Sequence, residues 1–168
     1  MSARQFYLRF YPIPDGMAAH AAGLEQDGWL LTDTQNLSID VFASLGIAAA
    51  ATSTLQLGTA VTNLTTRHPA VVASTFATLH HLSSGRAHIG VGRGDTALEL
   101  IGVRPPSASA FELQVAALQQ YLTGRASMWR GSKAASPGYR CPVRAKCQLM
   151  FSAPDRGCSA SVRPAVIG

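Results

Sequence analysis

The chain has 168 residues, of which 47% are hydrophobic and 14% are charged. This composition is typical of one globular domain and excludes a disordered, collagenous or coiled-coil protein. No apolar run approaches the roughly 18 residues of a membrane span, and the N-terminal stretch lacks the charged-then-apolar order of a secretory signal. We therefore expect a cytoplasmic protein without a membrane partner.

The net charge of +5 belongs to the C-terminal stretch. Residues 1–124 hold six of the 14 Lys and Arg residues and eight of the nine Asp and Glu residues, and residues 125–168 hold the rest. The three cysteines (Cys141, Cys147 and Cys158) also lie there, at spacings that match no zinc framework. Trp129 and Tyr139 lie among the basic residues and would suit single-stranded nucleic acid. We nevertheless expect neither a nucleic-acid partner nor a metal.

Residues 1–124 alternate short apolar runs with helical patterns, which is typical of βα units and a parallel sheet. The runs that predict strands are residues 6–10, 29–32, 55–62 and 87–91. Helical patterns begin near residues 15, 40, 69 and 109. Four such units predict an α/β fold, a partial (β/α)8 TIM barrel, because a complete barrel typically needs about 250 residues.

Capping and turn residues give the first three helices physical boundaries. Asp15 and Asp40 stand where N-caps belong, and Gly28 is the expected stop of the first helix. Pro69 suits the first position of the third helix, and Gly85 lies just past its expected end.

The fourth helix has the strongest pattern. Its capping box, Ser109-x-x-Glu112, precedes an apolar face, and Gly124 is the expected stop. No sustained period follows, so we expect residues 125–168 to form an irregular or disordered basic tail after a domain of residues 1–124. A reading-frame shift near residue 125 would explain the abrupt loss of acids, and a natural basic tail is the alternative.

Ligands of parallel βα folds bind at the carboxyl ends of the strands, where the βα loops and helix N-termini converge. In this sequence, polar groups follow the predicted strands at these positions. They are Asp33-Thr34-Gln35-Asn36, Thr62-Asn63 and Gly92-Arg93-Gly94-Asp95, while the first strand ends in Phe10-Tyr11. Polar groups are thus concentrated where a site is expected.

Asp33 and Asp95 are the candidate catalytic residues. Two carboxylates on one rim can bind a proton, a hydroxyl or a cationic group, and desolvation would raise the pKa of one toward that of a general acid. Alternatively, each is a helix or turn cap without chemistry. The run Gly90-x-Gly92-x-Gly94 can approach a flat ring or a phosphate, although it departs from the dinucleotide and P-loop motifs.

The histidines mostly indicate structural roles. His80 and His81 lie at the end of the third predicted helix, where a positive charge suits the helix dipole, and His88 lies within a strand. Arg67 and His68 lie in the loop that enters the third helix, where either side chain can reach an anion.

Four motifs, in their order and spacing, resemble the bacterial luciferase-like flavin and deazaflavin oxidoreductases. They are Leu57-Gly-Thr-Ala-Val-Thr-Asn63, Arg67-His-Pro69, Leu82-Ser-Ser-Gly-Arg86 and Gly90-Val-Gly-Arg-Gly-Asp95. Within that superfamily the sequence looks most like the methylenetetrahydromethanopterin reductase type, which uses the deazaflavin coenzyme F-420. The resemblance covers about residues 5–124. It implies the N-terminal half of a (β/α)8 barrel, with the coenzyme ring across the carboxyl ends of the strands.

The resemblance also implies a set of site residues. Asp33 and Asp95 would handle a proton or orient the substrate. Cofactor contacts are expected from Gln35, Ala60, Val61, Thr62, Asn63, Gly92, Arg93 and Gly94, with a non-prolyl cis peptide between Ala60 and Val61. Arg9 stands where the reductases have a glutamate, and Thr34 stands where many members have a histidine.

These observations predict a deazaflavin-dependent oxidoreductase that passes hydride between coenzyme F-420 and a small organic substrate, in a truncated form with weak or no activity. One alternative is an FMN-dependent luciferase-like monooxygenase. Another is a non-catalytic protein, either a truncated pseudo-enzyme or a basic-tailed binding protein. Because half a barrel leaves two sheet edges open, we also expect a homodimer or an aggregation-prone chain.

Overall fold

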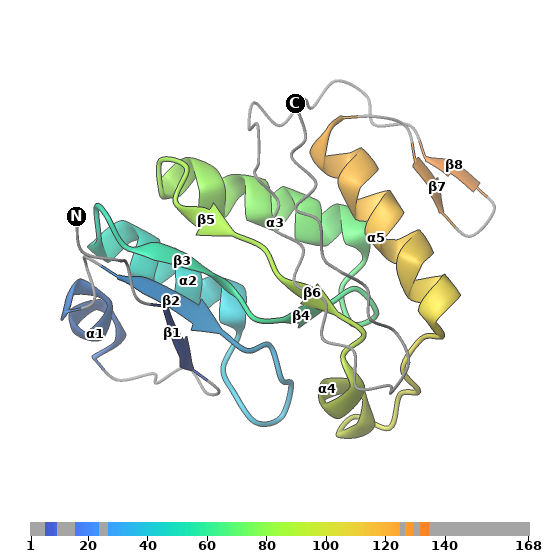
Figure 1. Cartoon of the computed structure of the whole chain (residues 1–168), viewed down its shortest axis with the longest axis horizontal. Helices are drawn as coiled ribbons and strands as arrows, with labels where there is room; N and C mark the ends of the chain where they lie inside the picture. Colours follow the sequence, from blue (N-terminus) through green and yellow to red (C-terminus); the bar gives the residue numbers. More distant parts are fainter. Residues whose placement is uncertain (1–5, 10–15, 24–26, 125–126, 130–131, 135–168) are drawn as a thin grey trace.

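The computed structural model of the chain describes residues 6–9, 16–23, 27–124, 127–129 and 132–134 (Figure 1). The elements, in chain order, are β1 (Phe6–Arg9), α1 (Met17–Gly23), β2 (Gly28–Leu31), α2 (Val41–Ala51), β3 (Gln56–Thr59), β4 (Thr62–Asn63), α3 (Pro69–Leu82), β5 (Ala87–His88), β6 (Val91–Gly92), α4 (Asp95–Glu99), α5 (Ala108–Leu122), β7 (Ser127–Trp129) and β8 (Ser132–Ala134). Strands and helices alternate over most of this length, as the sequence predicts.

Parallel strands form the sheet. β1, β2, β3 and β5 lie side by side in that order, and β4 pairs with β6 in a second parallel ladder. The register places Gly58 of β3 opposite His88 of β5. A Cβ on Gly58 would lie 2.3 Å from the His88 carbonyl oxygen, so glycine is required at this close approach. The predicted α/β class with a partial barrel of parallel strands is confirmed.

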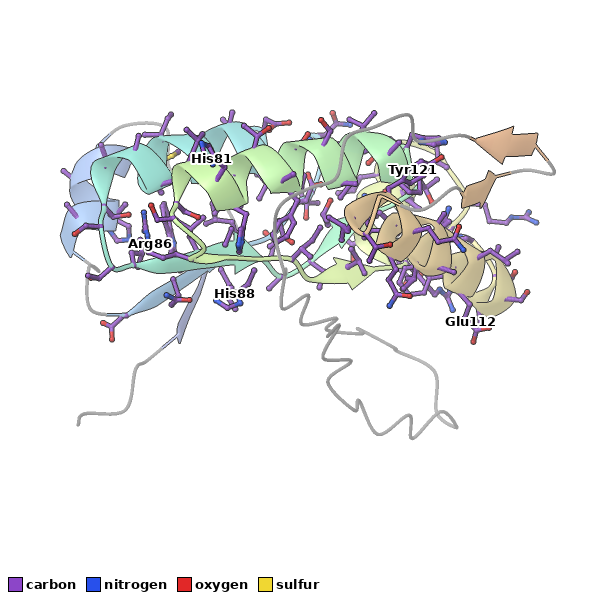
Figure 2. The ribbon with its side chains drawn as sticks, turned by 90° about the horizontal axis from the view of Figure 1, so that it is seen from above. His81, Arg86, His88, Glu112 and Tyr121 are labelled. Carbon is purple, nitrogen blue, oxygen red and sulfur yellow. The ribbon has the colours of Figure 1, made fainter. Side chains whose placement is uncertain are left out.

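The helices pack on the strands through a shared apolar core. Figure 2 shows α3 running along one face of the strands, and α3 packs against both α2 and α5. Large side chains from β2, α2, β3, α3 and α5 are fully buried between these layers, among them Trp29, Leu45, Leu57, Phe76 and Leu118. Each such side chain contributes about 1.5–3 kcal/mol on burial, so the apolar faces fix the helices on the sheet.

The expected N-terminal boundaries of α2 and α3 are confirmed. Asp40 caps α2, because its Oδ1 accepts hydrogen bonds from two backbone N–H groups of the first turn, both at 2.9 Å. α3 begins at Pro69, and the Nδ1 of His68 accepts from a first-turn N–H at 3.1 Å. His68 is therefore the N-cap of α3.

Two other boundaries differ from the prediction. Gly28 begins β2 and Asp27 before it is not helical, so Gly28 is not the stop of the first helix. The predicted cap Asp15 lies outside the described residues. The cap of α5 is Ser107, whose Oγ accepts from a first-turn N–H at 3.2 Å, so the assignment of the cap to Ser109 is wrong.

Two predicted strands are divided at the carboxyl edge of the sheet. Residues 55–62 form β3 and β4, and residues 87–91 form β5 and β6. The Ala60–Val61 peptide between β3 and β4 is cis, as the resemblance implies. The Thr59 hydroxyl donates to the carbonyl oxygen of Gly90 at 2.8 Å and accepts from its N–H at 3.0 Å. These hydrogen bonds join the break between β3 and β4 to the break between β5 and β6.

Three elements beyond β6 were not predicted as such. The segment that begins at Asp95 is the short helix α4. β7 and β8 form an antiparallel pair within the stretch that was expected to be irregular. That expectation is therefore wrong for these two strands. Residues 135–168, including the three cysteines, lie outside the described residues.

Arg86, the last residue of the Ser-Ser-Gly-Arg motif, ties the end of α2 to the segment that follows α3. Its guanidinium donates to the carbonyl oxygens of Ala49, Thr52 and Leu55, at 3.1, 2.8 and 2.7 Å. Its Nε donates to the carbonyl oxygen of Ser83 at 2.7 Å. The side chain thus satisfies carbonyl groups that the end of α2 leaves without intrahelical donors. Folding alone explains this arginine.

Candidate functional site

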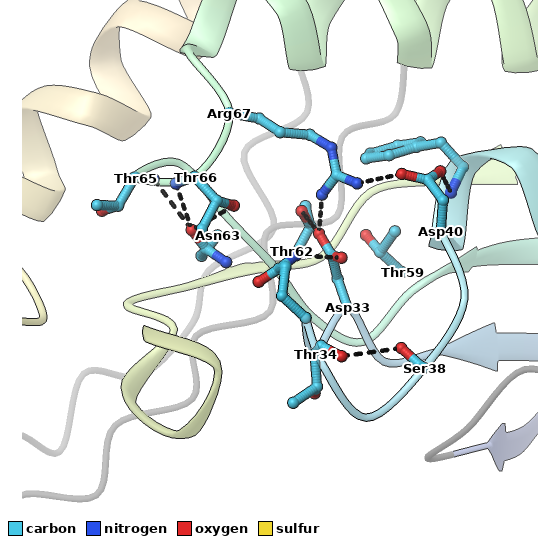
Figure 3. Close-up of polar contacts among 12 residues, drawn as sticks. Asp33, Thr34, Ser38, Asp40, Thr59, Thr62, Asn63, Thr65, Thr66 and Arg67 are labelled. Carbon is cyan, nitrogen blue, oxygen red and sulfur yellow. Dashed lines mark hydrogen bonds and ion pairs between the residues drawn. The ribbon is translucent and has the colours of Figure 1, made fainter. Parts of the chain in front are cut away.

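The expected polar rim forms where β2, β4 and β6 end (Figure 3). Asp33 follows β2, Asn63 ends β4, and residues 93–95 follow β6. β4 and β6 pair with Asn63 opposite Gly92. The backbone N–H of Asp33 donates to the carbonyl oxygen of Val61 at 3.3 Å. The structure therefore brings the three predicted segments to one edge of the sheet.

Asp33 is buried, with 5% of its surface exposed, and its carboxylate accepts three hydrogen bonds. Gln35 Nε2 donates to Oδ1 at 2.8 Å. Thr62 Oγ1 and Arg67 Nη1 donate to Oδ2, at 2.6 and 2.5 Å. Because all three partners are donors, the arrangement suits an ionised carboxylate, which can only accept. Asp33 does not cap α2, because Asp40 is the N-cap of that helix.

Arg67, in the segment between β4 and α3, joins two carboxylates. Nη1 binds Asp33, and Nη2 binds Oδ2 of Asp40, whose other oxygen caps α2. The guanidinium also lies over the Phe42 ring, 5.3 Å from its centroid. Figure 3 shows Arg67 reaching down between the two aspartates. One arginine therefore connects the segment after β4 with the loop after β2.

The two carboxylates on Arg67 have pKa values displaced in opposite directions. Burial raises the pKa of Asp33 above 3.8, against the hydrogen bond from Thr62 and the charge of Arg67. Burial also acts to raise the pKa of Asp40, but the hydrogen bond from the Ala43 N–H and the charge of Arg67 outweigh it, so this pKa lies below 3.8. The expectation that desolvation raises one carboxyl pKa on this rim is confirmed for Asp33.

Asn63 is 1% exposed, and its amide orientation is fixed by its neighbours. Oδ1 accepts from the N–H groups of Thr65 and Thr66, at 3.1 and 2.8 Å, and from the Thr66 hydroxyl at 3.0 Å. These donors require the oxygen on that side, so Nδ2 points the other way. Nδ2 is buried and has no hydrogen-bond partner among the described residues. A buried N–H group of this kind is available to a ligand acceptor.

Gly94 packs against this asparagine. Its φ is +82°, and a Cβ at this position would lie 2.6 Å from the Cβ of Asn63. A side chain at residue 94 would therefore displace Asn63 as well as strain the backbone. This contact explains the glycine without a ligand, whereas direct contact of Gly92 or Gly94 with a coenzyme stays a prediction.

Asp95 has a different environment from Asp33. It is the first residue of α4, and 34% of its side chain is exposed. Its Oδ1 lies 3.1 Å from Nη2 of Arg93. Exposed pairs of this kind contribute about 0–1 kcal/mol, so Asp95 can exchange this partner for another at small cost. The two candidate carboxylates are thus each paired with their own arginine.

Arg67 and Asp40 are the site residues that the sequence did not assign. Arg67 was expected only to reach an anion, and Asp40 only to cap a helix. The signal that could have found the pairing is that a buried aspartate needs a cationic or hydrogen-bonding partner. Thr62 and Asn63 were assigned correctly to the rim, but their partners depend on tertiary contacts.

The described histidines make structural contacts. His88 Nε2 lies 2.6 Å from Gln56 Oε1 on the neighbouring strand. His80 lies in the last turn of α3, as expected, and burial lowers its pKa from 6.5, against a hydrogen bond to the Ala87 backbone. Over the described ranges, no group of His, Cys, Asp and Glu is placed to hold a metal ion. No helix there is long and apolar enough to span a bilayer.

Two buried hydrogen-bonding atoms of the rim have no partner among the described residues. Gln35 uses Nε2 on Asp33, and its buried Oε1 has no partner in the part of the chain that the structure describes. Asn63 Nδ2 is thus a donor and Gln35 Oε1 an acceptor. The pyrimidine edge of a flavin or deazaflavin ring carries carbonyl oxygens and a ring N–H, the kinds of group that one donor and one acceptor bind.

The chain belongs to the luciferase-like monooxygenase family, whose model matches residues 16–155. This match confirms the resemblance in the motifs and extends it beyond residue 124, where the sequence analysis placed its end. Proteins similar to this chain in sequence or in fold include oxidoreductases that differ in cofactor.

Three of these proteins illustrate the range. The 5,10-methylenetetrahydromethanopterin reductase of Methanolobus tindarius is 36% identical over 127 residues, which cover 71% of this chain and 38% of that protein. The solved coenzyme F-420-dependent tetrahydromethanopterin reductase of Methanopyrus kandleri has a TM-score of 0.73 at 24% identity, covering 91% of this chain and 51% of that one. A type II Baeyer–Villiger monooxygenase from Pseudomonas putida, solved with FMN, has a TM-score of 0.65 at 16% identity, covering 82% of this chain and 44% of that one. The chain therefore matches about half or less of each of these proteins.

Proposed function

We propose that this chain forms part of an oxidoreductase that binds the deazaflavin coenzyme F-420 and passes hydride between the coenzyme and a small organic substrate. The observation that carries the proposal is the pair of buried, oriented atoms on the rim, Asn63 Nδ2 and Gln35 Oε1. Family membership supports an oxidoreductase, and the names of the reductase relatives support the deazaflavin.

In this proposal, the rim binds the ring through its pyrimidine edge. Asn63 donates to a ring carbonyl, and Gln35 accepts from the ring N–H. Asp33 accepts hydrogen bonds from both Gln35 and Thr62, and so it holds Gln35 and the end of β4 in position. Such fixed polar groups position a ring at little entropic cost when it binds. Further contacts from Ala60, Val61, Gly92, Arg93 and Gly94 remain predictions of the resemblance.

The chemistry divides between coenzyme and protein. When bound, the coenzyme ring supplies or accepts the hydride, and the chain supplies position and electrostatics. Of the two roles expected for Asp33, its three donors favour orientation over proton transfer. Asp95, with its partly exposed carboxylate and weak ion pair, is the residue we assign to orienting the substrate or exchanging a proton with it.

An FMN-dependent monooxygenase is the second candidate. FMN presents the same pyrimidine edge, so Asn63 and Gln35 suit both rings equally. The fold is also similar to that of an FMN-bound monooxygenase. The two candidates differ in which coenzyme the chain prefers.

Titration of the purified chain with coenzyme F-420 and with FMN, followed by ligand fluorescence, tests the proposal. We expect F-420 to bind more tightly than FMN. We expect its dissociation constant to lie above micromolar, because the strands of this chain form only part of the coenzyme envelope. Asn63→Ala should weaken binding about tenfold, the effect of losing one buried hydrogen bond. Gln120→Ala, which removes an amide from α5, is the matched control.

Preference for FMN would favour the second candidate. Binding of neither ring at millimolar concentration, or equal affinities of Asn63→Ala and the wild type, would refute the proposed site.

A further inference from the structure

The parallel sheet of β1, β2, β3 and β5 has two faces, and the helices pack on one of them. Along β2, Trp29 and Leu31 are fully buried in the core shared with the helices, whereas Leu30 between them is half-buried. Successive side chains of a strand point to opposite faces, so Leu30 lies on the face away from the helices. Gly58 and His88 follow Leu30 in the same row of the sheet, and Figure 2 shows His88 on the side of the strands away from α3. We call this row of three residues the inner face.

The same sheet has two outer edges. In the part of the chain that the structure describes, β1 pairs with β2 alone and β5 pairs with β3 alone. Every pairing in this sheet is parallel, so the two outer strands run in the same direction. The outer edge of a strand presents backbone N–H and C=O groups that a further strand can pair with. Each outer strand can therefore accept one more parallel strand.

A second copy of the chain supplies what the sheet needs on both edges. A closed barrel of this class has eight parallel strands with helices outside, and the ladder described above contributes four strands within residues 6–124. Residues 135–168 form a much shorter stretch, which is too short to supply four further units of this size. A second copy contributes four strands that carry their own helices.

The inner face is suited to enclosure by such a copy. β2, β3 and β5 contribute no Asp, Glu, Lys or Arg side chain, so closure over these strands buries no charge from them. The polar group of the inner face already has a partner, because His88 Nε2 lies 2.6 Å from Gln56 Oε1. Leu30 adds apolar surface beside it. Two inner faces can therefore meet without repulsion between like charges from these strands.

One symmetry operation brings both edges together. A two-fold rotation about an axis along the strands keeps all strands parallel, and it places β1 of the partner copy beside β5 and β5 of the partner copy beside β1. Closed two-fold symmetry is also the commonest arrangement of homo-oligomers. We propose that two copies of this chain pair through these edges and close one eight-stranded barrel, with their inner faces turned toward the common axis. This proposal concerns the ligand-free protein and is independent of the coenzyme.

Two measurements on the wild-type chain test the proposal. In sedimentation velocity we expect a species with twice the mass of one chain. In an NMR sample mixed from nitrogen-15-labelled and carbon-13-labelled chains, contacts between copies should join β5 of one copy to β1 of the other. A monomer, or an aggregate without a defined dimer, would overturn the proposal. Contacts between copies through α2 or α3, or residues 135–168 on the inner face of their own chain, would also overturn it.

A pair of variants tests the inner face. Leu30→Asp would enclose a carboxylate without a partner, so the dimer should dissociate at chain concentrations more than about a hundredfold higher than the wild type. Leu113→Asp places the same charge on α5, at a side chain that is 71% exposed, and should associate as the wild type does. Circular dichroism reports whether each variant folds, and the mixed-label measurement on the wild type decides if Leu30→Asp does not. Equal association of the two folded variants would overturn the proposal.

Discussion

Replacement of Arg86 with Met should destabilise the fold and leave the ligand edge intact. Arg86 is 8% exposed, and the carbonyl oxygens of Ala49, Thr52 and Leu55 accept hydrogen bonds from its guanidinium. A buried acceptor without a partner costs about 1–3 kcal/mol, and a bond from a charged donor contributes about 1.5–3 kcal/mol. These values are not additive and water can enter near the half-buried Thr52, so we expect a total loss of about 3–5 kcal/mol.

That loss is large beside the total stability of about 5–15 kcal/mol for a domain. Urea unfolding followed by circular dichroism measures it, and Arg104→Met, which removes an exposed charge, should change the free energy of unfolding by less than about 0.5 kcal/mol. The folded variant should bind coenzyme F-420 as the wild type does. A loss below about 1 kcal/mol in Arg86→Met, or a selective loss of coenzyme F-420 binding, would contradict a purely structural role for Arg86.

Three further predictions concern the rim. Gly94→Ala should cost about 1–3 kcal/mol and weaken ring binding, because its Cβ would displace Asn63. Gly102→Ala, at a φ of +70° with open space around it, carries the backbone cost alone, so equal losses of ring binding in the two variants would contradict this reason. Because the pKa of Asp33 is raised, its protonation stabilises the fold fully below about pH 3.8, and this contribution is lost as the pH rises through the folded-state pKa. The free energy of unfolding of the wild type relative to Asp33→Asn should therefore fall as the pH rises from about 3.8 through the folded-state pKa of Asp33. A constant difference would refute a raised pKa for Asp33. In a protein with measurable catalytic activity, Asp95→Ala should lower the turnover number by more than about tenfold at unchanged coenzyme affinity. An unchanged turnover number would leave Asp95 with its ion pair to Arg93 alone.

The sequence predicted those parts of the fold that depend on local contacts. Asp40 and Pro69 mark the starts of α2 and α3 because a cap and a first-turn proline act within a few residues. The cap of α5 was assigned wrongly because Ser107 and Ser109 are both suitable serines, and the backbone decides between them. The breaks in the strands were missed because Thr59 and Gly90, 31 residues apart, hold them together.

The site shows the same limit. Strand ends placed Asp33, Thr62 and Asn63 on one rim without any structure. The pairing of Asp33 with Arg67 joins residues 34 apart, and no local pattern specifies it. The orientation of the Asn63 amide depends on how the segment after β4 turns back, and this too is visible only in three dimensions.

The most direct test of the site is the side-chain amide of Asn63, observed by nitrogen-15 NMR while coenzyme F-420 is added to the chain. The Asn63→Ala variant assigns the signal. If Nδ2 binds a ring carbonyl, its two N–H signals should shift as the coenzyme binds, while amide signals from α1 remain in place. Coenzyme binding that leaves the Asn63 signals unmoved, or the absence of binding at millimolar coenzyme, would contradict the account.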